Sequence, residues 1–432
     1  MKHLKSIVMA GFALAIFLPL PFTSQAQTWT ELTTTGGITA RSNSSSIHVP
    51  QRHEWVVFGG TSAQGRENDV WILDLNTAVW REVVPSNAAP APRHTQNAVY
   101  DRANDRMIIF SGQGGGLFND AWAFTFADSS WTNLSVNGNA AGVPLQRYVG
   151  VTEWDSLNGQ FVTFAGFTTS GRFEDTWTFN ATTNTWTDVS GSVFPDKRCL
   201  FNSTLAHDRR QMIIYGGQGT GNFDDIWACD LDTYAWTELT PAVTPPGRHF
   251  SSVVYRGNGE VVIFGGNGFN QNNFAGALND LWSFDLDSQT WTQLNAGSSL
   301  PAKRVGHVAD YLPGEDKMIV FGGNMIGGQE LADVWVLDFS PAVGIEDEIE
   351  AAPLTVYPNP ARDELGIRFD LEEASRLNFR VYDQAGNLVL QADRGDGFIG
   401  RIDKRLDIST LSPGLYFLEV QGRRERAKFL KF

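Results

Sequence analysis

The chain has 432 residues, of which 42% are hydrophobic and 19% are charged, and this composition excludes wholesale disorder. The formal net charge of −15 argues against nucleic acid or an anionic membrane surface as a partner. We therefore expect an acidic globular protein, long for one ordinary domain but normal for a closed repeat architecture with an appendage.

The first 26 residues have the order of a secretory signal peptide. Lys2 and Lys5 precede an apolar run from Ile7 to about Leu20, and small residues follow at positions 24–26. The run is shorter than the ~20 residues that a membrane-spanning helix needs. We expect residues 1–26 to be removed, and we expect no transmembrane segment in the mature chain.

One pattern recurs six times between residues 28 and 340. In each unit a short apolar run ends in glycine, an arginine lies about nineteen residues before that glycine, and an Asp-x-Trp triplet follows it. In the first five units a second tryptophan follows nine residues after the first. The arginines are Arg41, Arg93, Arg147, Arg198, Arg248 and Arg304, and the aspartates are Asp69, Asp120, Asp175, Asp225, Asp280 and Asp333.

This pattern resembles the kelch repeat, whose period is about 50 residues and whose units are four-stranded blades of a β-propeller. The sixth unit lacks the second tryptophan, but Trp29 lies in an N-terminal segment that matches residues 235–239. We therefore predict an all-β fold: a six-bladed kelch-type propeller over residues 27–340, followed by a small C-terminal β-sandwich. The N-terminal strand should complete the last blade and so remove an open sheet edge.

The chain has two cysteines, Cys199 and Cys229, which the repeat places in the first and third strands of one blade. Two strand spacings are roughly 9–10 Å, beyond the ~7 Å Cα separation that a disulfide tolerates. We predict no disulfide.

The rhythm stops after residue 340. Residues 341–353 are acidic, have proline at both ends and are predicted to be a linker, and residues 354–432 alternate in about seven short strands. This tail resembles the C-terminal sorting domain of the type IX secretion system. The matching residues include Pro358, Asn359, Pro360, Gly386, Gly414 and Tyr416.

The sorting-domain resemblance implies that type IX machinery exports the chain across the outer membrane, usually with removal of the tail. The product would be secreted or attached to the cell surface. A permanent sugar-binding or spacer sandwich is the alternative.

A binding site is expected on the face of the propeller that carries the longer loops, around the mouth of the central channel. Directly after the six arginines come Ser42, His94, Tyr148, Cys199, His249 and Val305. Of these, His94, Tyr148 and His249 could bind copper or zinc. Copper radical oxidases resembling galactose oxidase hold a metal at this mouth, but the second ligating tyrosine and the crosslinked cysteine of their pattern are not found. The alternative is packing and hydrogen bonding at the strand start.

Four further residues are candidates for binding. Glu174 and Asp224 replace an asparagine of the other units, so they could serve in acid–base chemistry or calcium binding, or simply be solvated. Phe269 and Phe274 lie in a long loop of the fifth unit and have no counterparts elsewhere. The repeated aspartates occur in every unit, so we interpret them as architectural, capping loop amides or meeting an arginine.

We therefore expect a non-catalytic binding module for protein or carbohydrate, without a required cofactor. The alternative is a secreted enzyme, either a galactose oxidase-like metal oxidase or a carbohydrate-active enzyme, with its site at the channel mouth. The common hydrolase and phosphate-binding motifs are missing from the sequence.

Overall fold

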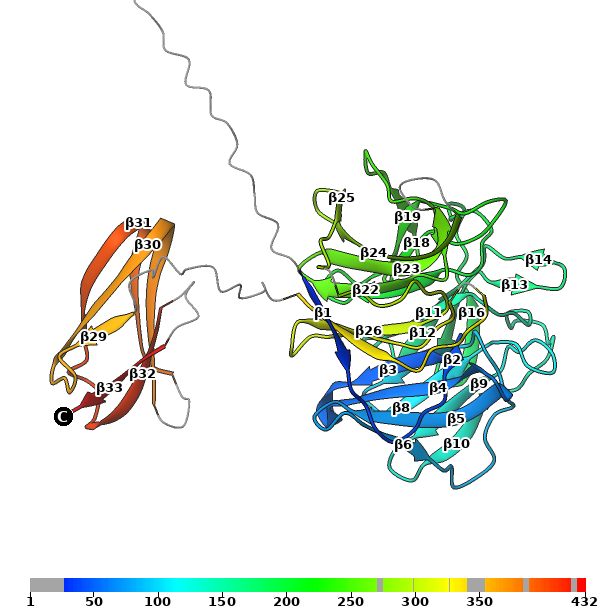
Figure 1. The fold of residues 1–432 in the computed structure, drawn as a ribbon, viewed down its shortest axis with the longest axis horizontal. Helices are drawn as coiled ribbons and strands as arrows, with labels where there is room; N and C mark the ends of the chain where they lie inside the picture. The colour runs from blue at the N-terminus through cyan, green and yellow to red at the C-terminus, as the bar shows by residue number, and fades with distance from the viewer. Residues whose placement is uncertain are drawn as a thin grey trace, which may run out of the picture. The chain divides into compact units, whose positions relative to one another are not determined.

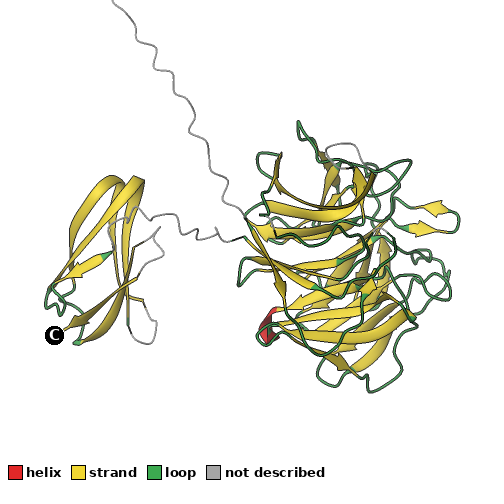
Figure 2. Ribbon diagram, in the orientation of Figure 1, coloured by secondary structure: helices red, strands yellow, loops and turns green. Residues whose placement is uncertain are grey.

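The computed structural model describes residues 27–269, 275–297, 299–325, 327–339, 354–383, 388–420 and 426–432. The chain divides into two compact units, Met1–Ala342 and Val343–Phe432. Strands form nearly all the regular structure of the described residues, and their helical structure is a single short 3-10 turn, η1 (Pro50–Arg52) (Figure 2). The described part of the chain has no helix that is long and apolar enough to span a membrane.

The described part of the first unit forms six sheets with four strand positions each, from the centre outward, and one two-stranded sheet. Blade 1 contains β2 (Arg41–Ser42), β3 (Ser45–Val49), β4 (Glu54–Ser62), β5 (Gly65–Asp74) and β6 (Val79–Val83). Blade 2 contains β7 (Asn97–Asp101), β8 (Arg106–Phe110), β9 (Ala121–Thr125) and β10 (Ser130–Ser135). Blade 3 contains β11 (Val151–Asp155), β12 (Gln160–Phe164), β15 (Thr176–Asn180) and β16 (Thr185–Asp188).

The other three blades repeat this order. Blade 4 contains β17 (Asn202–Ala206), β18 (Gln211–Tyr215), β19 (Ile226–Asp230) and β20 (Trp236–Leu239). Blade 5 contains β21 (Arg248–His249), β22 (Ser252–Gly257), β23 (Glu260–Phe269), β24 (Ala275–Asp285) and β25 (Thr290–Gln293). Blade 6 contains β26 (Val308–Leu312), β27 (Lys317–Phe321), β28 (Val334–Asp338) and, as its outer strand, β1 (Thr28–Leu32).

The N-terminal strand closes the ring. β1 pairs antiparallel with β28, and Trp29 lies opposite Leu337. Trp29 is 2% exposed, and its ring lies 4.8 Å from that of Phe264 in blade 5. The innermost strands β3, β7, β11, β17, β22 and β26 contact one another in this order, and β26 contacts β3. The predicted β-propeller is therefore confirmed, with six blades in its described residues.

The second strand of each blade is buried on both faces, which explains its continuous apolar run. In β4, for example, every side chain from Trp55 to Phe58 is fully buried. A strand that solvates one face would alternate instead. The inner strand begins later than the sequence suggested, since the arginine precedes it and belongs to a strand only in β2 and β21.

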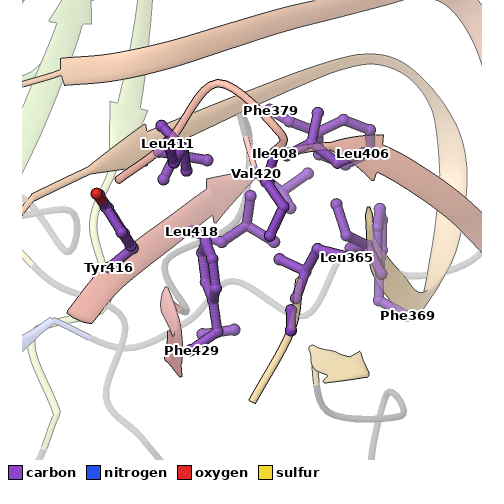
Figure 3. Close-up of a cluster of buried hydrophobic side chains, with 14 of the residues drawn as sticks. Leu365, Phe369, Phe379, Leu406, Ile408, Leu411, Tyr416, Leu418, Val420 and Phe429 are labelled. Atoms are coloured by element: carbon purple, nitrogen blue, oxygen red, sulfur yellow. The ribbon is translucent and has the colours of Figure 1, made fainter. Parts of the chain in front are cut away.

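The described residues of the C-terminal unit form one sheet of five strands, whereas about seven short strands were predicted. They are β29 (Thr355–Tyr357), β30 (Glu364–Tyr382), β31 (Leu388–Asp407), β32 (Gly414–Val420) and β33 (Arg426–Lys431). β30 and β31 stay paired through several register shifts, so segments that alternate separately in the sequence belong to two long strands. Their inner face covers a core that includes Leu365, Phe379, Leu418 and Phe429 (Figure 3).

The sorting-motif residues hold the last strand in place. The Asn359 side chain donates to the carbonyl of Lys428 at 3.0 Å and accepts from the amide of Leu430 at 2.9 Å. Pro358 and Pro360 flank it, Gly414 pairs with Lys431, and Tyr416 donates to the carbonyl of Ser412 at 2.7 Å. Gly386 lies outside the described residues, as do the predicted signal peptide and the linker.

Candidate binding site at the channel mouth

A repeated buried cluster builds the wall of the channel. Each repeat arginine is 0–1% exposed and donates two hydrogen bonds of 2.6–3.0 Å to the repeat aspartate of its own blade. It also donates to the carbonyl that precedes the last glycine of the apolar run, at 2.9–3.2 Å. The tryptophan of Asp-x-Trp donates its indole N–H to the same carboxylate at 2.7–2.9 Å. Arginine and tryptophan together therefore occupy both oxygens of each aspartate, and the architectural role of the aspartates stays a prediction.

Three phenylalanines complete this cluster. Phe118, Phe173 and Phe223 lie flat under the guanidinium groups of Arg93, Arg147 and Arg198, at 4.1–4.3 Å from ring centroid to the guanidinium carbon. This cation–π packing explains why an aromatic residue precedes the repeat aspartate by two positions.

Neighbouring blades are joined by backbone hydrogen bonds at the channel. The last glycine of each apolar run donates its N–H to the carbonyl of the next blade's arginine at 2.8–3.2 Å. A Cβ at Gly60 would lie 2.8 Å from the carbonyl oxygen of Ser42, and at Gly323 it would lie 2.8 Å from that of Val305. Glycine is therefore required at positions 60 and 323, because a Cβ there would clash with the backbone of Ser42 and Val305.

The residues two positions after the repeat arginines form a closed ring of backbone hydrogen bonds around the axis, which we call the belt. It consists of Asn43, Thr95, Val149, Leu200, Phe250 and Gly306, each of which donates its N–H to the carbonyl of the preceding member at 2.7–3.3 Å. All six have φ between 52° and 62°, which turns their amides along the ring. All six belt residues line a cavity of about 60 Å³.

Above the belt, the residue after each arginine pairs with the residue after the last glycine of the apolar run. Thus Ser42, His94, Tyr148, Cys199, His249 and Val305 pair with Thr61, Gln113, Phe167, Gln218, Asn267 and Asn324. The sequence suggested the first set but not the second. We define these twelve residues as the mouth layer, and four of the twelve carry amide side chains.

The two histidines of the mouth layer are held by amides. His94 Nε2 lies 3.1 Å from Gln113 Oε1, and His249 has Asn222 Oδ1 2.9 Å from its Nδ1 and Asn267 Nδ2 3.3 Å from its Nε2. Burial lowers the pKa of both imidazoles. Both ring nitrogens of His249 are engaged, whereas His94 Nδ1 is buried without a partner among the described residues. The described residues contain no group of three His, Cys, Asp or Glu side chains arranged for a metal.

An arginine that the sequence analysis missed contacts Cys199 and Gln218 of the mouth layer. Arg172 comes from a β-hairpin present in blade 3, formed by β13 (Phe167–Thr168) and β14 (Gly171–Arg172) (Figure 1). Its Nε lies 3.3 Å from Cys199 Sγ and its Nη2 lies 3.3 Å from Gln218 Oε1. Burial raises the pKa values of the Tyr148 phenol and the Cys199 thiol, so both remain protonated at neutral pH.

A second missed residue, Glu330, reaches the mouth layer from the blade 6 loop. Its Oε1 accepts from Ser42 Oγ at 3.1 Å, and its Oε2 is buried without a partner among the described residues. Burial raises the pKa of this carboxyl group. The two residues are 288 positions apart in the sequence, so local pattern could not have paired them.

The remaining predicted residues lie outside the mouth layer. Glu174 forms an ion pair with Lys197 at 3.3 Å, and Asp224 accepts from Thr244 Oγ1 at 3.0 Å. Phe269 ends β23 and is 44% exposed, and Phe274 lies outside the described residues. Cys199 and Cys229 are buried free thiols in a blade where β18 separates β17 from β19.

Two carboxyl groups lie below the belt, in the inner strands of opposite blades. Glu153 accepts from Ser203 Oγ at 2.6 Å, and Asp310 accepts from Ser46 and, at 2.7 Å, from the Trp55 indole. Burial raises the pKa of Glu153 to about 7 and that of Asp310 to about 6. Neither was predicted, since neither residue occurs as a repeat landmark.

Comparisons with known proteins agree with this architecture. The family model of the KLHDC2/KLHL20/DRC7 Kelch-repeats domain matches residues 20–152, 90–266 and 242–346, and that of the secretion system C-terminal sorting domain matches residues 355–431. The solved structure titled "Structure of YjhT" has a TM-score of 0.56 at 14% identity over 69% of this chain and 95% of that chain, which shows the shared fold.

Two curated proteins are similar over the propeller. The leucine-zipper-like transcriptional regulator 1 homolog of Drosophila melanogaster is 26% identical over 75% of this chain and 34% of that protein. Adagio-like protein 1 of Oryza sativa subsp. japonica is 26% identical over 73% of this chain and 44% of that protein. The chain therefore spans less than half the length of either relative.

Proposed function

Because the chain belongs to the kelch-repeat family and carries a secretion-system sorting domain, we propose that it is exported by a type IX route and binds a protein or carbohydrate ligand at the mouth layer. The tail would engage the secretion machinery, and the propeller would act outside the cell, released or attached to its surface.

The observation that carries this proposal is a difference between two sets of side chains around the axis, the repeat aspartates and the mouth layer. The repeat carboxylates accept hydrogen bonds from buried arginines. The mouth layer instead contains amides, a phenol, imidazoles and the Phe167 ring. Amide side chains donate and accept at once, so they match both peptide groups and sugar hydroxyls. Such a layer suits recognition better than acid–base catalysis, which needs titratable groups near their working pKa.

A glycan array and a panel of surface proteins, probed with residues 27–432, would test this proposal. We expect a ligand whose binding falls at least tenfold in Gln218→Ala and in Asn267→Ala, because each removes an amide of the mouth layer. Gln51→Ala, an exposed amide in η1 between two strands of blade 1, is the matched control and should bind as the unmodified protein does. The mouth would be refuted as the binding site if all three variants weakened binding equally, or if neither Gln218→Ala nor Asn267→Ala weakened it.

A further inference from the structure

Two junctions between blades share one cluster of side chains on the face opposite the mouth. At the junction of blades 1 and 2, Arg52 bonds Glu54 Oε2 at 3.0 Å and Asp105 Oδ2 at 2.6 Å, and it lies 4.2 Å over the Phe126 ring. Tyr100 donates to the same Asp105 at 2.8 Å.

The junction of blades 5 and 6 repeats this cluster. Arg256 bonds Glu260 Oε2 at 2.7 Å and both oxygens of Asp316 at 2.8 Å, and it lies 4.6 Å over the Phe339 ring. Tyr311 donates to Asp316 at 2.9 Å. The junction of blades 1 and 2 can therefore be compared, group by group, with the junction of blades 5 and 6.

The two junctions differ in the residues beside the glutamate. In blade 1 the other oxygen of Glu54 accepts from the Arg81 guanidinium at 2.8 Å, and Arg81 lies opposite Ile72 across the sheet. The same register in blade 5 holds Thr292 opposite Ser283. No side chain within the described ranges bonds Glu260 Oε1, because threonine is too short to replace the guanidinium.

A cavity of about 540 Å³ lies where that guanidinium is missing, and its lining includes Glu260, Ser283, Asp285, Thr292 and Tyr311. Ser283 is 9% exposed, and its hydroxyl group has no partner in the described part of the chain. It lines the cavity, and its hydroxyl oxygen is not itself buried, so it is open to a group bound there.

The lining also opposes like charges. Glu260 and Asp285 are cross-strand partners, an arrangement that is destabilising when no cation lies between them. Asp285 Oδ1 accepts from the turn at Asp287 and Ser288, whereas its Oδ2 forms no such bond within the described residues. Blade 4 has Gln211 opposite Asp230 at these positions and so lacks the opposed charges.

We propose that this cavity binds a guanidinium or ammonium group from outside the chain, held by Glu260 Oε1, Asp285 and Ser283. The bound group takes the position that Arg81 occupies beside Glu54 in blade 1. The cation is either an arginine or lysine side chain of a protein partner or a free small amine, since both present the same donors.

Titration of residues 27–432 at low salt with N-acetyl-arginine amide and with putrescine, followed by isothermal calorimetry, tests the proposal and separates the two sources. A peptide-borne cation predicts tighter binding of the arginine amide, and a small free amine predicts tighter binding of putrescine. Glu260→Gln should weaken binding of the preferred probe about tenfold, because a charged acceptor is lost. The change is structurally conservative, since blades 3 and 4 already hold glutamine at this position.

A second variant tests the internal comparison directly. Thr292→Arg should fill the cavity with the guanidinium of blade 1, abolish probe binding and preserve the fold. Glu238→Gln, which removes an exposed charge from β20, controls for nonspecific attraction. Equal weakening in Glu238→Gln and Glu260→Gln, unchanged binding in Thr292→Arg, or no binding of either probe would each overturn the proposal.

Discussion

The backbone N–H of Gly323 donates to the carbonyl oxygen of Arg41 at 2.9 Å, so the last blade is bonded to the first repeat residue of the first blade. The same bond joins every other pair of neighbouring blades at 2.8–3.2 Å. The junction that closes the ring is therefore chemically equivalent to the five junctions within the chain.

The closing strand should contribute as much stability as an internal one. Trp29→Ala removes a side chain packed on Phe264 and should cost about 3–5 kcal/mol of unfolding free energy, measured by urea denaturation. Trp131→Ala is the matched reference, because Trp131 packs 5.2 Å from Phe58 of the preceding blade and is equally buried. A loss below 1 kcal/mol for Trp29 alone would show that β1 does not complete blade 6.

Adjacent aspartates should differ sharply in their effect on stability. Asp225→Asn leaves the buried Arg198 without its carboxylate and should lower the unfolding free energy by about 3 kcal/mol. Asp224→Asn changes an exposed neighbour whose partner is the half-buried Thr244, so we expect a change within about 0.5 kcal/mol. Equal effects in thermal or chemical denaturation would contradict the architectural role of the repeat aspartate.

Glu153 should make the propeller less stable as the pH rises. Its folded pKa of about 7 is above the ordinary value of 4.5, so its contribution is fully present below pH 4.5 and is lost as the pH rises through 7. Between pH 5.5 and 7.5 this loss is on the order of 1–2 kcal/mol.

The comparison with Glu153→Gln isolates this effect. Burial lowers the pKa of His307 to about 3 and that of His48 to about 4, so these groups favour the folded state above pH 6.5 and oppose the trend of Glu153. The difference in unfolding free energy between the variant and the unmodified protein cancels their contribution. A difference that is independent of pH from 5.5 to 7.5 would refute the raised pKa.

Metal analysis discriminates between the binding module and the oxidase. Because His94 and His249 are engaged by amides, we expect purified residues 27–432 to retain well under one equivalent of copper or zinc after dialysis. Plasma emission spectroscopy measures this content, with His94→Gln and His249→Asn as paired variants. One equivalent of copper that both substitutions remove would establish the oxidase instead.

Asn359→Ala should expose the edge of the last strand in the C-terminal unit. The side chain of Asn359 satisfies both the Leu430 amide and the Lys428 carbonyl, so its loss should speed hydrogen exchange over residues 426–432 at least tenfold. Ser409→Ala, in a turn of the same unit, should leave that exchange unchanged. Hydrogen–deuterium exchange mass spectrometry measures the exchange rate over residues 426–432 in both variants.

The periodic landmarks predicted the fold because each has a repeated physical reason. The arginine, the aspartate and the tryptophan of one unit form a single buried hydrogen-bonded cluster. Each blade needs this cluster, so the same spacing recurs in every unit. The tail was harder to divide, because bulges within β30 and β31 break the alternation without ending the strand.

The mouth could be predicted only in part. The position after each arginine was evident from the repeat, but its partner after the last glycine required the pairing of two segments about nineteen residues apart. Arg172 and Glu330 come from loops that break the repeat, and Glu153 and Asp310 from inner-strand positions whose residue types vary. Such contacts between blades depend on closure of the ring rather than on local pattern.

The belt of six backbone amides is made from asparagine, threonine, valine, leucine, phenylalanine and glycine, so its geometry does not depend on side-chain identity. Because these bonds join backbone groups only, the side chains at the six positions can change while the hydrogen bonds that join neighbouring blades at the axis persist.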